Sequence, residues 1–221
     1  MAVRLGLAGG ERRAVRAVGE HYYAQDPQAR HDRRELEVTV AGERLTFTTD
    51  AGVFGKRRLD PGTRLLLENV ELPETGTILD LGCGWGAIGT AVARRAPRCW
   101  VYLVDINQRA VDLARANLAR NGVRNAEVLA GDGLAPVGGL CFDLILTNPP
   151  VRAGKAVLYR LMAEAAAHLR PGGRFVAVIG NKQGADSYRA KVQEVFGNAR
   201  DIGKGGGYRV IQAVKGADEE K

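Results

Sequence analysis

The chain has 221 residues, of which 45% are hydrophobic and 26% charged, and its net charge is +7. This composition is typical of one globular domain and excludes disordered and fibrous proteins. No apolar run is long enough to cross a membrane, and charges interrupt the N-terminal one, so we expect a cytoplasmic protein with neither a membrane span nor a signal peptide.

The first regular element that the sequence predicts is a β-hairpin. Residues 35–40 and 44–49 alternate apolar and polar side chains on either side of a turn that contains Gly42. Asp60 and Pro61 then predict the start of a helix, and Leu65 begins its apolar face.

From residue 76 the pattern changes to alternating strands and helices. We predict strands over 77–81, 100–106, 126–133, 141–150 and 174–180, helices over 88–96, 108–123, 155–173 and 185–197, and a terminal strand pair over 199–202 and 207–214. Apolar strands that alternate with helices indicate a sheet covered on both faces. The expected fold is a Rossmann-like, doubly wound α/β fold with a mostly parallel seven-stranded sheet and an N-terminal hairpin. We expect an extension over 1–60, a main domain over 61–215 and a charged tail over 216–221.

Cysteine and histidine spacing argues against a metal site. The three cysteines are Cys83, Cys99 and Cys141. Their odd number and wide spacing are typical of reduced thiols and fit no disulfide framework. His21, His31 and His168 have no ligand spacing to them, so we predict no metal.

The basic balance favours a polyanionic partner, and nucleic acid is the usual one. Residues 94–124 alone hold seven Arg and two Asp. A compositionally biased genome would give a similar balance, because Arg far outnumbers Lys.

A glycine-rich segment, Asp80-Leu81-Gly82-Cys83-Gly84-Trp85-Gly86, follows the first strand of the main domain. Glycines in this position expose backbone N–H groups to a ligand. With Gly89, the segment also contains the GxGxxG spacing of dinucleotide sites, which is a weak signal by itself. The Asp80 carboxylate would repel a pyrophosphate and attract a cationic amine or sulfonium.

Further polar residues follow the next three strands. In a parallel sheet, ligands bind at the carboxyl ends of the strands. Asp105 there can accept both hydroxyl hydrogens of a ribose, and Asp132, between Gly131 and Gly133, can accept an adenine amino hydrogen. Alternatively, Asp105 could have only the structural role of a helix cap, and Asp132 could belong to an ordinary turn.

Asn148-Pro149-Pro150 ends the fourth strand with a rigid backbone. The Asn148 side chain and the Pro149 carbonyl can accept the two hydrogens of an amine and direct its nitrogen at an electrophile. A strand terminator is the alternative interpretation. No Cys, His or Ser constellation offers an enzyme nucleophile.

These motifs, in this order, resemble the class I S-adenosylmethionine-dependent methyltransferases, and the NPP sequence resembles those that methylate amines. The upstream segment FTTDAGVFGKRRLDPGTRLLL resembles the guanine exocyclic-amine methyltransferases of small-subunit ribosomal RNA and their single-domain relatives. The resemblance implies that S-adenosylmethionine is the cofactor and that RNA, as ribosomal RNA or a small ribosomal subunit, is the partner. It implies a cofactor site made of Phe54, Gly55, Asp80, Gly82, Cys83, Gly84, Trp85, Gly86, Asp105, Ile106, Gly131, Asp132, Gly133 and Asn148. Asn148, Pro149 and Pro150 would hold the target amine, and Val151, Arg152 and Lys155 would contact substrate.

The chain departs from this family at two points. Val151 stands where such enzymes often have an aromatic residue that stacks on the flipped base, so another aromatic residue would have to stack, and the candidates are Tyr22, Tyr23, Phe54 and Tyr208. A second, degenerate methyltransferase-like domain is also missing from the sequence ahead of the main domain. Both departures concern the identity of the target base.

Three other functions remain open. A protein glutamine or another amine presents the same NH₂ group as a nucleobase. A nicotinamide-binding protein would use Gly84, Gly86 and Gly89, although Asp80 argues against it. A non-catalytic RNA-binding module would retain the fold without turnover.

Overall fold

A computed structural model describes residues 30–55 and 57–217 and contains a seven-stranded sheet beside a two-stranded hairpin. The sheet strands are β3 (Gly76–Leu81), β4 (Cys99–Asp105), β5 (Ala126–Ala130), β6 (Phe142–Thr147), β7 (Leu169–Gly180), β8 (Arg200–Gly205) and β9 (Tyr208–Val214). Their order is β5-β4-β3-β6-β7-β9-β8, and β9 runs antiparallel to both β7 and β8, whereas the other neighbouring strands are parallel. The predicted Rossmann-like, mostly parallel sheet is confirmed.

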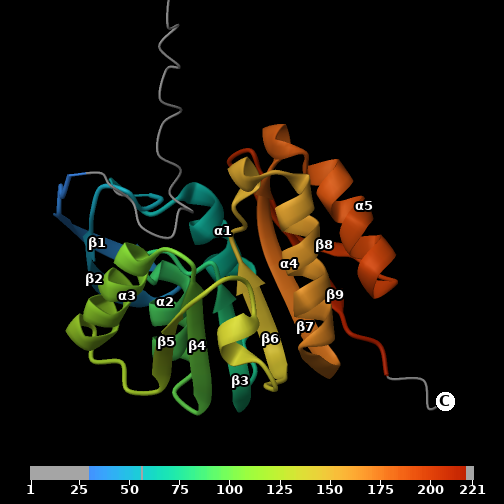
Figure 1. The fold of residues 1–221 in the computed structure, drawn as a ribbon, viewed down its shortest axis with the longest axis horizontal. Helices are drawn as coiled ribbons and strands as arrows, with labels where there is room; N and C mark the ends of the chain where they lie inside the picture. Colours follow the sequence, from blue (N-terminus) through green and yellow to red (C-terminus); the bar gives the residue numbers. More distant parts are fainter. Residues whose placement is uncertain (1–29, 56, 218–221) are drawn as a thin grey trace, which may run out of the picture.

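Helices cover both faces of this sheet (Figure 1). They are α1 (Pro61–Asn69), α2 (Ala87–Arg95), α3 (Gln108–Arg120), α4 (Lys155–Ala167) and α5 (Ala185–Phe196), with short 3₁₀ helices at Ala135–Val137, Val151–Ala153 and Asn181–Gln183. Successive strand residues point to opposite faces, so Ile78 packs in the core beneath α1, α2 and α3, while Leu79 packs beneath α4 and α5. The apolar runs of the sequence are continuous because both faces are buried.

The strand order reverses at β3, and this reversal positions the site. From β3 the chain proceeds through β4 and β5 to one edge of the sheet, and then returns to β6 on the other side of β3. The loops that leave β3 and β6 therefore diverge, which opens a crevice beyond the carboxyl ends of the strands.

The hairpin consists of β1 (Arg34–Val40) and β2 (Glu43–Thr49) and lies next to α3 at one end of the molecule, far from α5 (Figure 1). Its turn residues, Ala41 and Gly42, have φ angles of 47° and 85°. Positive φ at both positions is the geometry that matches the twist of a two-residue hairpin. The apolar face of the hairpin joins the core beneath α2 and α3.

The sequence prediction was wrong at the C-terminal end of α4. The sequence predicts a helix over 155–173, but α4 ends at Ala167 and β7 already begins at Leu169. The pairing of β7 with β6 shifts between Phe142 and Leu144, and this irregularity accommodates Pro171. Gly172 donates to Lys215, and Gly173 accepts from it, so Pro171–Gly173 belong to the sheet rather than to a helix end.

No helix within residues 30–55 and 57–217 is long and apolar enough to span a membrane. The stacking candidates Tyr22 and Tyr23 lie outside the described residues, as do residue 56 and residues 218–221 of the expected tail.

Candidate active site

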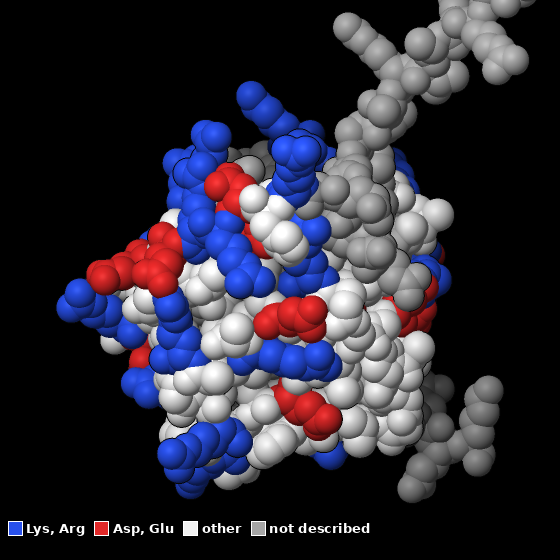
Figure 2. Space-filling model, turned by 60° about the vertical axis from the view of Figure 1, so that its left-hand side comes forward, with Lys and Arg blue, Asp and Glu red and all other residues white. Residues whose placement is uncertain are grey.

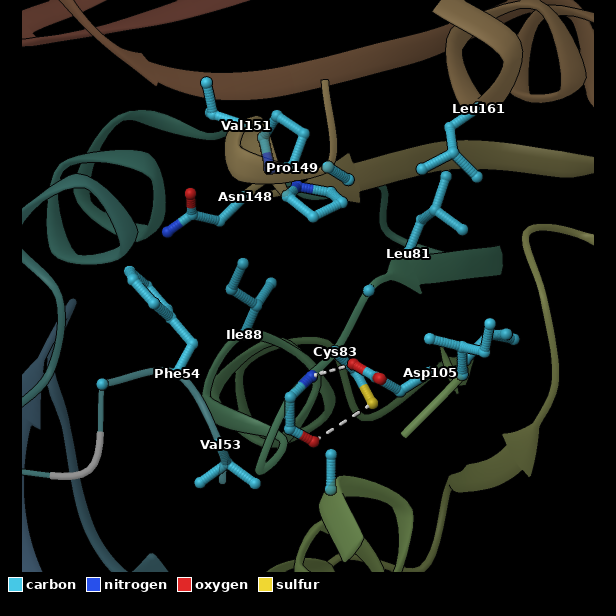
Figure 3. Close-up of a pocket in the computed structure, with 18 of the residues that line it drawn as sticks. Val53, Phe54, Leu81, Cys83, Ile88, Asp105, Asn148, Pro149, Val151 and Leu161 are labelled. Carbon is cyan, nitrogen blue, oxygen red and sulfur yellow. Dashed lines mark hydrogen bonds between the residues drawn. The ribbon is translucent and has the colours of Figure 1, made fainter. Parts of the chain in front are cut away.

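A cavity of about 410 Å³ lies beyond the carboxyl ends of β3, β4, β5 and β6. The segment between β2 and α1 covers one side of it, and the residues after β6 form the opposite side (Figure 3). The cavity gathers most residues of the predicted site: Phe54, Gly55, Gly82, Cys83, Gly84, Trp85, Asp105, Ile106, Gly131, Asp132, Gly133, Asn148, Pro149, Pro150, Val151 and Arg152.

The glycines after β3 have two different roles. Gly82 and Gly84 have φ angles of 74° and 55°, and a Cβ atom at either position would meet no atom within 4 Å. They leave room for a ligand beside the backbone. A Cβ at Gly86 would lie 3.1 Å from Ala114, and one at Gly89 would lie 2.4 Å from the Leu103 side chain. The second pair therefore permits close packing of α2 against the sheet and α3.

Asp80 lies beneath this loop rather than along the cavity wall. Its side chain is completely buried, and Oδ2 accepts a hydrogen bond of 2.8 Å from the Gly89 N–H. Oδ1 has no hydrogen-bond partner among the described residues. Burial raises the pKa of Asp80 to about 7, assisted by the negative charge of Asp105 and opposed by the Gly89 hydrogen bond. The sequence had predicted Asp80 in the cofactor site itself.

Asp105 ends β4 and connects two loops at the cavity. Its Oδ2 accepts from Gly84 N at 2.7 Å, and its Oδ1 accepts from Asn107 N at 2.9 Å. Burial raises the pKa of this carboxyl group against the lowering effect of those bonds. Asn107 itself caps α3 by accepting from the N–H groups of Arg109 and Ala110, so Asp105 is not the helix cap.

Asp132 lies on the cavity but is already paired. The Arg160 guanidinium donates to Asp132 Oδ1 at 2.7 Å and to Glu164 at 2.7 Å. Glu164 in turn accepts from Leu134 N at 3.1 Å. An adenine amino group would therefore meet an Asp132 carboxylate held by Arg160, a residue that the sequence interpretation had missed.

Asn148 has a defined orientation at the end of β6. Its Nδ2 atom donates to Asp60 Oδ1 and to Thr63 Oγ1, both at 3.0 Å. The Pro149 carbonyl accepts from Val151 N at 2.8 Å, which uses one of its two lone pairs. The remaining acceptors of this turn are the Asn148 Oδ1 atom and the other Pro149 lone pair.

Phe54 borders the cavity close to Asn148, on the same side of the view (Figure 3). Its side chain is 43% exposed, and its carbonyl accepts from Trp85 Nε1 at 2.7 Å. Trp85 packs edge-on against Phe47 with ring centroids 4.8 Å apart, so the covering segment is attached to both the glycine loop and the hairpin. Tyr208 also lines the cavity, whereas Lys155 is exposed at the start of α4 outside it.

Several lining residues have no sequence motif that would have revealed them. They come from α1, α2, α3, α4, the turn after β7, and β9: Asp60, Thr63, Ile88, Ala110, Arg160, Leu161, Gln183 and Tyr208. Asp60 was recognisable only as a helix-start residue, which indicates a structural role, and Tyr208 only as one of four candidate stacking residues.

The residues present fit S-adenosylmethionine. The open backbone at Gly82 and Gly84 accommodates its methionine portion, the unpartnered Asp80 oxygen lies below that loop, and Asp105 can accept from a ribose. A pyrophosphate would fit less well, because Asp80 and Asp105 are both acidic.

Comparison with known proteins is consistent with this fit. A family model described as the methyltransferase small domain matches residues 44–212. An uncharacterized protein of Bacillus subtilis (strain 168), YbxB, is 38% identical over 90% of this chain and 100% of its own length. Ribosomal RNA small subunit methyltransferase C of Pseudomonas fluorescens is 38% identical over 83% of this chain and 55% of its own.

A solved structure is also similar. The T. thermophilus 16S rRNA N2 G1207 methyltransferase (RsmC), in complex with AdoMet and guanosine, superposes with a TM-score of 0.74 at 31% identity. The match covers 83% of this chain and 50% of that one. This chain therefore spans all of YbxB but about half of the ribosomal RNA enzymes.

Proposed function

The chain belongs to the methyltransferase small domain family, whose methyl donor is S-adenosylmethionine, and on that premise we propose that it methylates an exocyclic amine of a nucleobase, guanine in ribosomal RNA. The observation that carries this proposal is the orientation of Asn148. Both hydrogens of its amide point to Asp60 and Thr63, which leaves an acceptor oxygen for a donor such as an amine. Bound S-adenosylmethionine supplies an electrophilic methyl group on a sulfonium.

The protein's own residues act mainly by positioning. Asn148 Oδ1 and the Pro149 carbonyl accept the two hydrogens of the amine, which favours lone-pair density on its nitrogen. The nitrogen would accept the methyl group that the sulfonium supplies, the sulfur would keep the electron pair of the broken bond, and the extra proton would leave to water. Cys83, the thiol that lines the cavity, is a poor nucleophile, because burial and two neighbouring carboxylates raise its pKa well above its usual range.

Support for an RNA substrate comes from charge near the cavity and from the relatives. Arg152 lines the cavity, and Lys155 is exposed three residues later, while Arg57 and Arg58 are exposed beside the covering segment. Phosphates that flank a flipped nucleotide would meet these side chains. Two relatives are named as ribosomal RNA methyltransferases, one of them as a 16S rRNA N2 G1207 methyltransferase.

Phe54 is the described aromatic residue best placed to stack on the base. Val151 lines the cavity after the two prolines, where it offers no ring. Tyr208 is fixed to α1, because its hydroxyl approaches Asp60 at 3.4 Å and its ring lies against Gly62. Phe54 instead has an exposed ring close to Asn148.

The proposal is tested by transfer of a tritiated methyl group. Small and large ribosomal subunits, their extracted RNA and total protein are taken from cells that lack this protein, so that the target amine is unmethylated. We expect label in one RNA fraction, on N2 of a guanine after digestion to nucleosides. Label in protein alone would identify a glutamine or another protein amine as the target and would overturn the proposal.

Two variants separate chemistry from cofactor binding. Asn148→Ala should abolish turnover, a loss of about 100-fold or more, while the calorimetric affinity for S-adenosylmethionine stays within about twofold. Asp105→Ala should instead weaken the cofactor. Asn198→Ala, after α5 and remote from the cavity, is the matched control, and wild-type turnover by Asn148→Ala would contradict the mechanism.

A further inference from the structure

Asp60 contacts three parts of the molecule that are far apart in sequence. It is the N-cap of α1, and its Oδ1 accepts from Thr63 N at 3.0 Å. The same oxygen accepts from Asn148 Nδ2 at 3.0 Å, and Oδ2 lies 3.4 Å from the Tyr208 hydroxyl. A helix cap requires only the first of these bonds.

These contacts determine which atom of the Asn148 amide is available. An amide nitrogen has two hydrogens, and here one goes to Asp60 and the other to Thr63 Oγ1. A carboxylate can only accept, so the opposite rotamer would place two oxygens, Asn148 Oδ1 and Asp60 Oδ1, against each other. The contact with Asp60 therefore leaves Oδ1 as the one polar atom of the side chain that can bind another group.

The surroundings make this constraint rigid. Thr63 is 5% exposed, and a Cβ at the neighbouring Gly62 would lie 2.6 Å from the Tyr208 ring. Tyr208 and α1 are thus in close contact, so Asp60 has little freedom to turn away. Burial and the Asp60 carboxylate raise the pKa of Tyr208, which keeps its hydroxyl protonated and able to donate.

We propose that Asp60, together with Thr63, is a positioning residue that holds the Asn148 amide with its oxygen available to the amine to be methylated. The proposal rests on the proposed function and assigns to the start of α1 a part in the reaction besides capping. Asp60 acts through Asn148 and touches neither the methyl group nor the amine.

Matched substitutions separate capping from positioning. Asp60→Ser preserves an N-cap but is too short to reach Asn148, whereas Asp60→Asn preserves both the cap and an oxygen at the right distance. Thr63→Val removes one acceptor without a change of shape, and Thr63→Ser retains it. We expect Asp60→Ser and Thr63→Val to lower kcat by about 10- to 100-fold, and the two conservative variants to recover much of that loss.

Cofactor affinity and melting temperature show whether the effect is merely structural. For Asp60→Ser we expect the Kd for S-adenosylmethionine within about twofold of wild type, and a melting temperature equal to that of Asp60→Asn. A wild-type kcat in Asp60→Ser, or a loss of kcat shared equally by Asp60→Asn, would overturn the proposal.

A second readout does not depend on the substrate. In ¹⁵N-labelled protein the Asn148 side-chain amide is assigned from its disappearance in Asn148→Asp. Its hydrogens should exchange slowly in wild type and at least tenfold faster in Asp60→Ser and Thr63→Val. If no RNA fraction accepts methyl groups but these differences appear, the proposed function fails and the positioning role holds. Unchanged exchange in both variants would overturn the positioning role even if the enzyme methylates RNA.

Discussion

Asp80 is a buried acid whose ionisation is unfavourable in the folded state. Its ordinary pKa of 3.8 is raised to about 7, and its Oδ1 has no partner among the described residues. A folded-state pKa above the unfolded value means that the contribution of Asp80 to stability is fully present below pH 3.8 and is lost as the pH rises through about 7. The loss is about 1.4 kcal/mol for each pH unit in that interval.

Asp80→Asn should remove most of this pH dependence. We expect the free energy of unfolding of the ligand-free wild type to fall between pH 4.5 and 7.5, and that of the variant to change much less. Urea unfolding at both pH values measures the difference. Asp105→Asn is the comparison, because the pKa of Asp105 is also raised by burial. Equal slopes in wild type and Asp80→Asn would show that Asp80 is already ionised at pH 4.5.

At the scale of elements, α3 binds the open edge of the hairpin through two asparagines. Asn117 accepts from Thr48 N at 2.7 Å and donates to Thr48 O at 2.9 Å. Asn121 pairs in the same way with Thr46, at 3.0 and 2.8 Å. Four residues of helix rise about 6 Å and two residues of strand about 6.7 Å, so the two side chains match alternate residues of β2. The two side chains thus form the hydrogen bonds with the backbone of β2 that a neighbouring third strand would otherwise form.

Asn117 also reaches the glycine loop, because its Nδ2 donates to Trp85 O at 2.8 Å. Asn117→Ala should therefore lower stability by about 2–4 kcal/mol and also weaken S-adenosylmethionine binding. Asn121→Ala should destabilise the hairpin while cofactor affinity stays unchanged. Chemical unfolding, calorimetry and amide exchange at Thr46 and Thr48 distinguish the two variants. Equal cofactor affinity in both variants would mean that the bond from Asn117 to Trp85 O does not support the glycine loop.

Across the whole molecule, the net charge is +7, and the basic side chains differ in whether they form ion pairs. The face at the hairpin end carries basic side chains interleaved with acidic ones (Figure 2). Many of these arginines form ion pairs, such as Arg94 with Glu43 and Arg120 with Glu35. Among the described residues, Arg57, Arg58 and Lys155 have no ion pair, so the basic charge beside the cavity is more available to phosphates than the total suggests.

RNA binding should thus depend on salt through the residues beside the cavity. If Arg152 and Lys155 each contact a phosphate, the double variant Arg152→Ala/Lys155→Ala should reduce the slope of log affinity against log salt by about 1.4. The matched control is Arg98→Ala/Arg124→Ala, which removes two charges where β4 and β5 begin, at the opposite edge of the sheet. Fluorescence anisotropy with a labelled RNA stem-loop measures both slopes. If the double variant Arg152→Ala/Lys155→Ala had the same slope as wild type, the RNA would bind to another part of the surface.

The sequence by itself was sufficient to predict the fold and to place most of the glycine-rich segment at the cavity. Strands with continuous apolar sequences indicate that both faces of the sheet are buried. Glycines directly after a strand indicate a backbone that can lie close to a ligand. The strand ends at Asp105, Gly131 and Asn148 were also predictable, because parallel strands bring their carboxyl ends to one edge of the sheet. Each of these predictions depends only on residues within one short segment of the sequence, so it could be made without knowledge of the tertiary structure.

Only the tertiary structure decided how the side chains of this edge are used. Asp80 lies beneath the loop, Arg160 holds Asp132, and Asp60 orients Asn148 across 88 residues of sequence. The last two contacts join residues that are 28 and 88 positions apart, a separation that no local sequence pattern reveals. Which polar residues come within hydrogen-bond distance at this edge depends on how the elements pack. The same reason explains Pro171–Gly173, which would end a helix by local preference but lie in β7, where Gly172 and Gly173 bond to Lys215, 42 or more residues later in the chain.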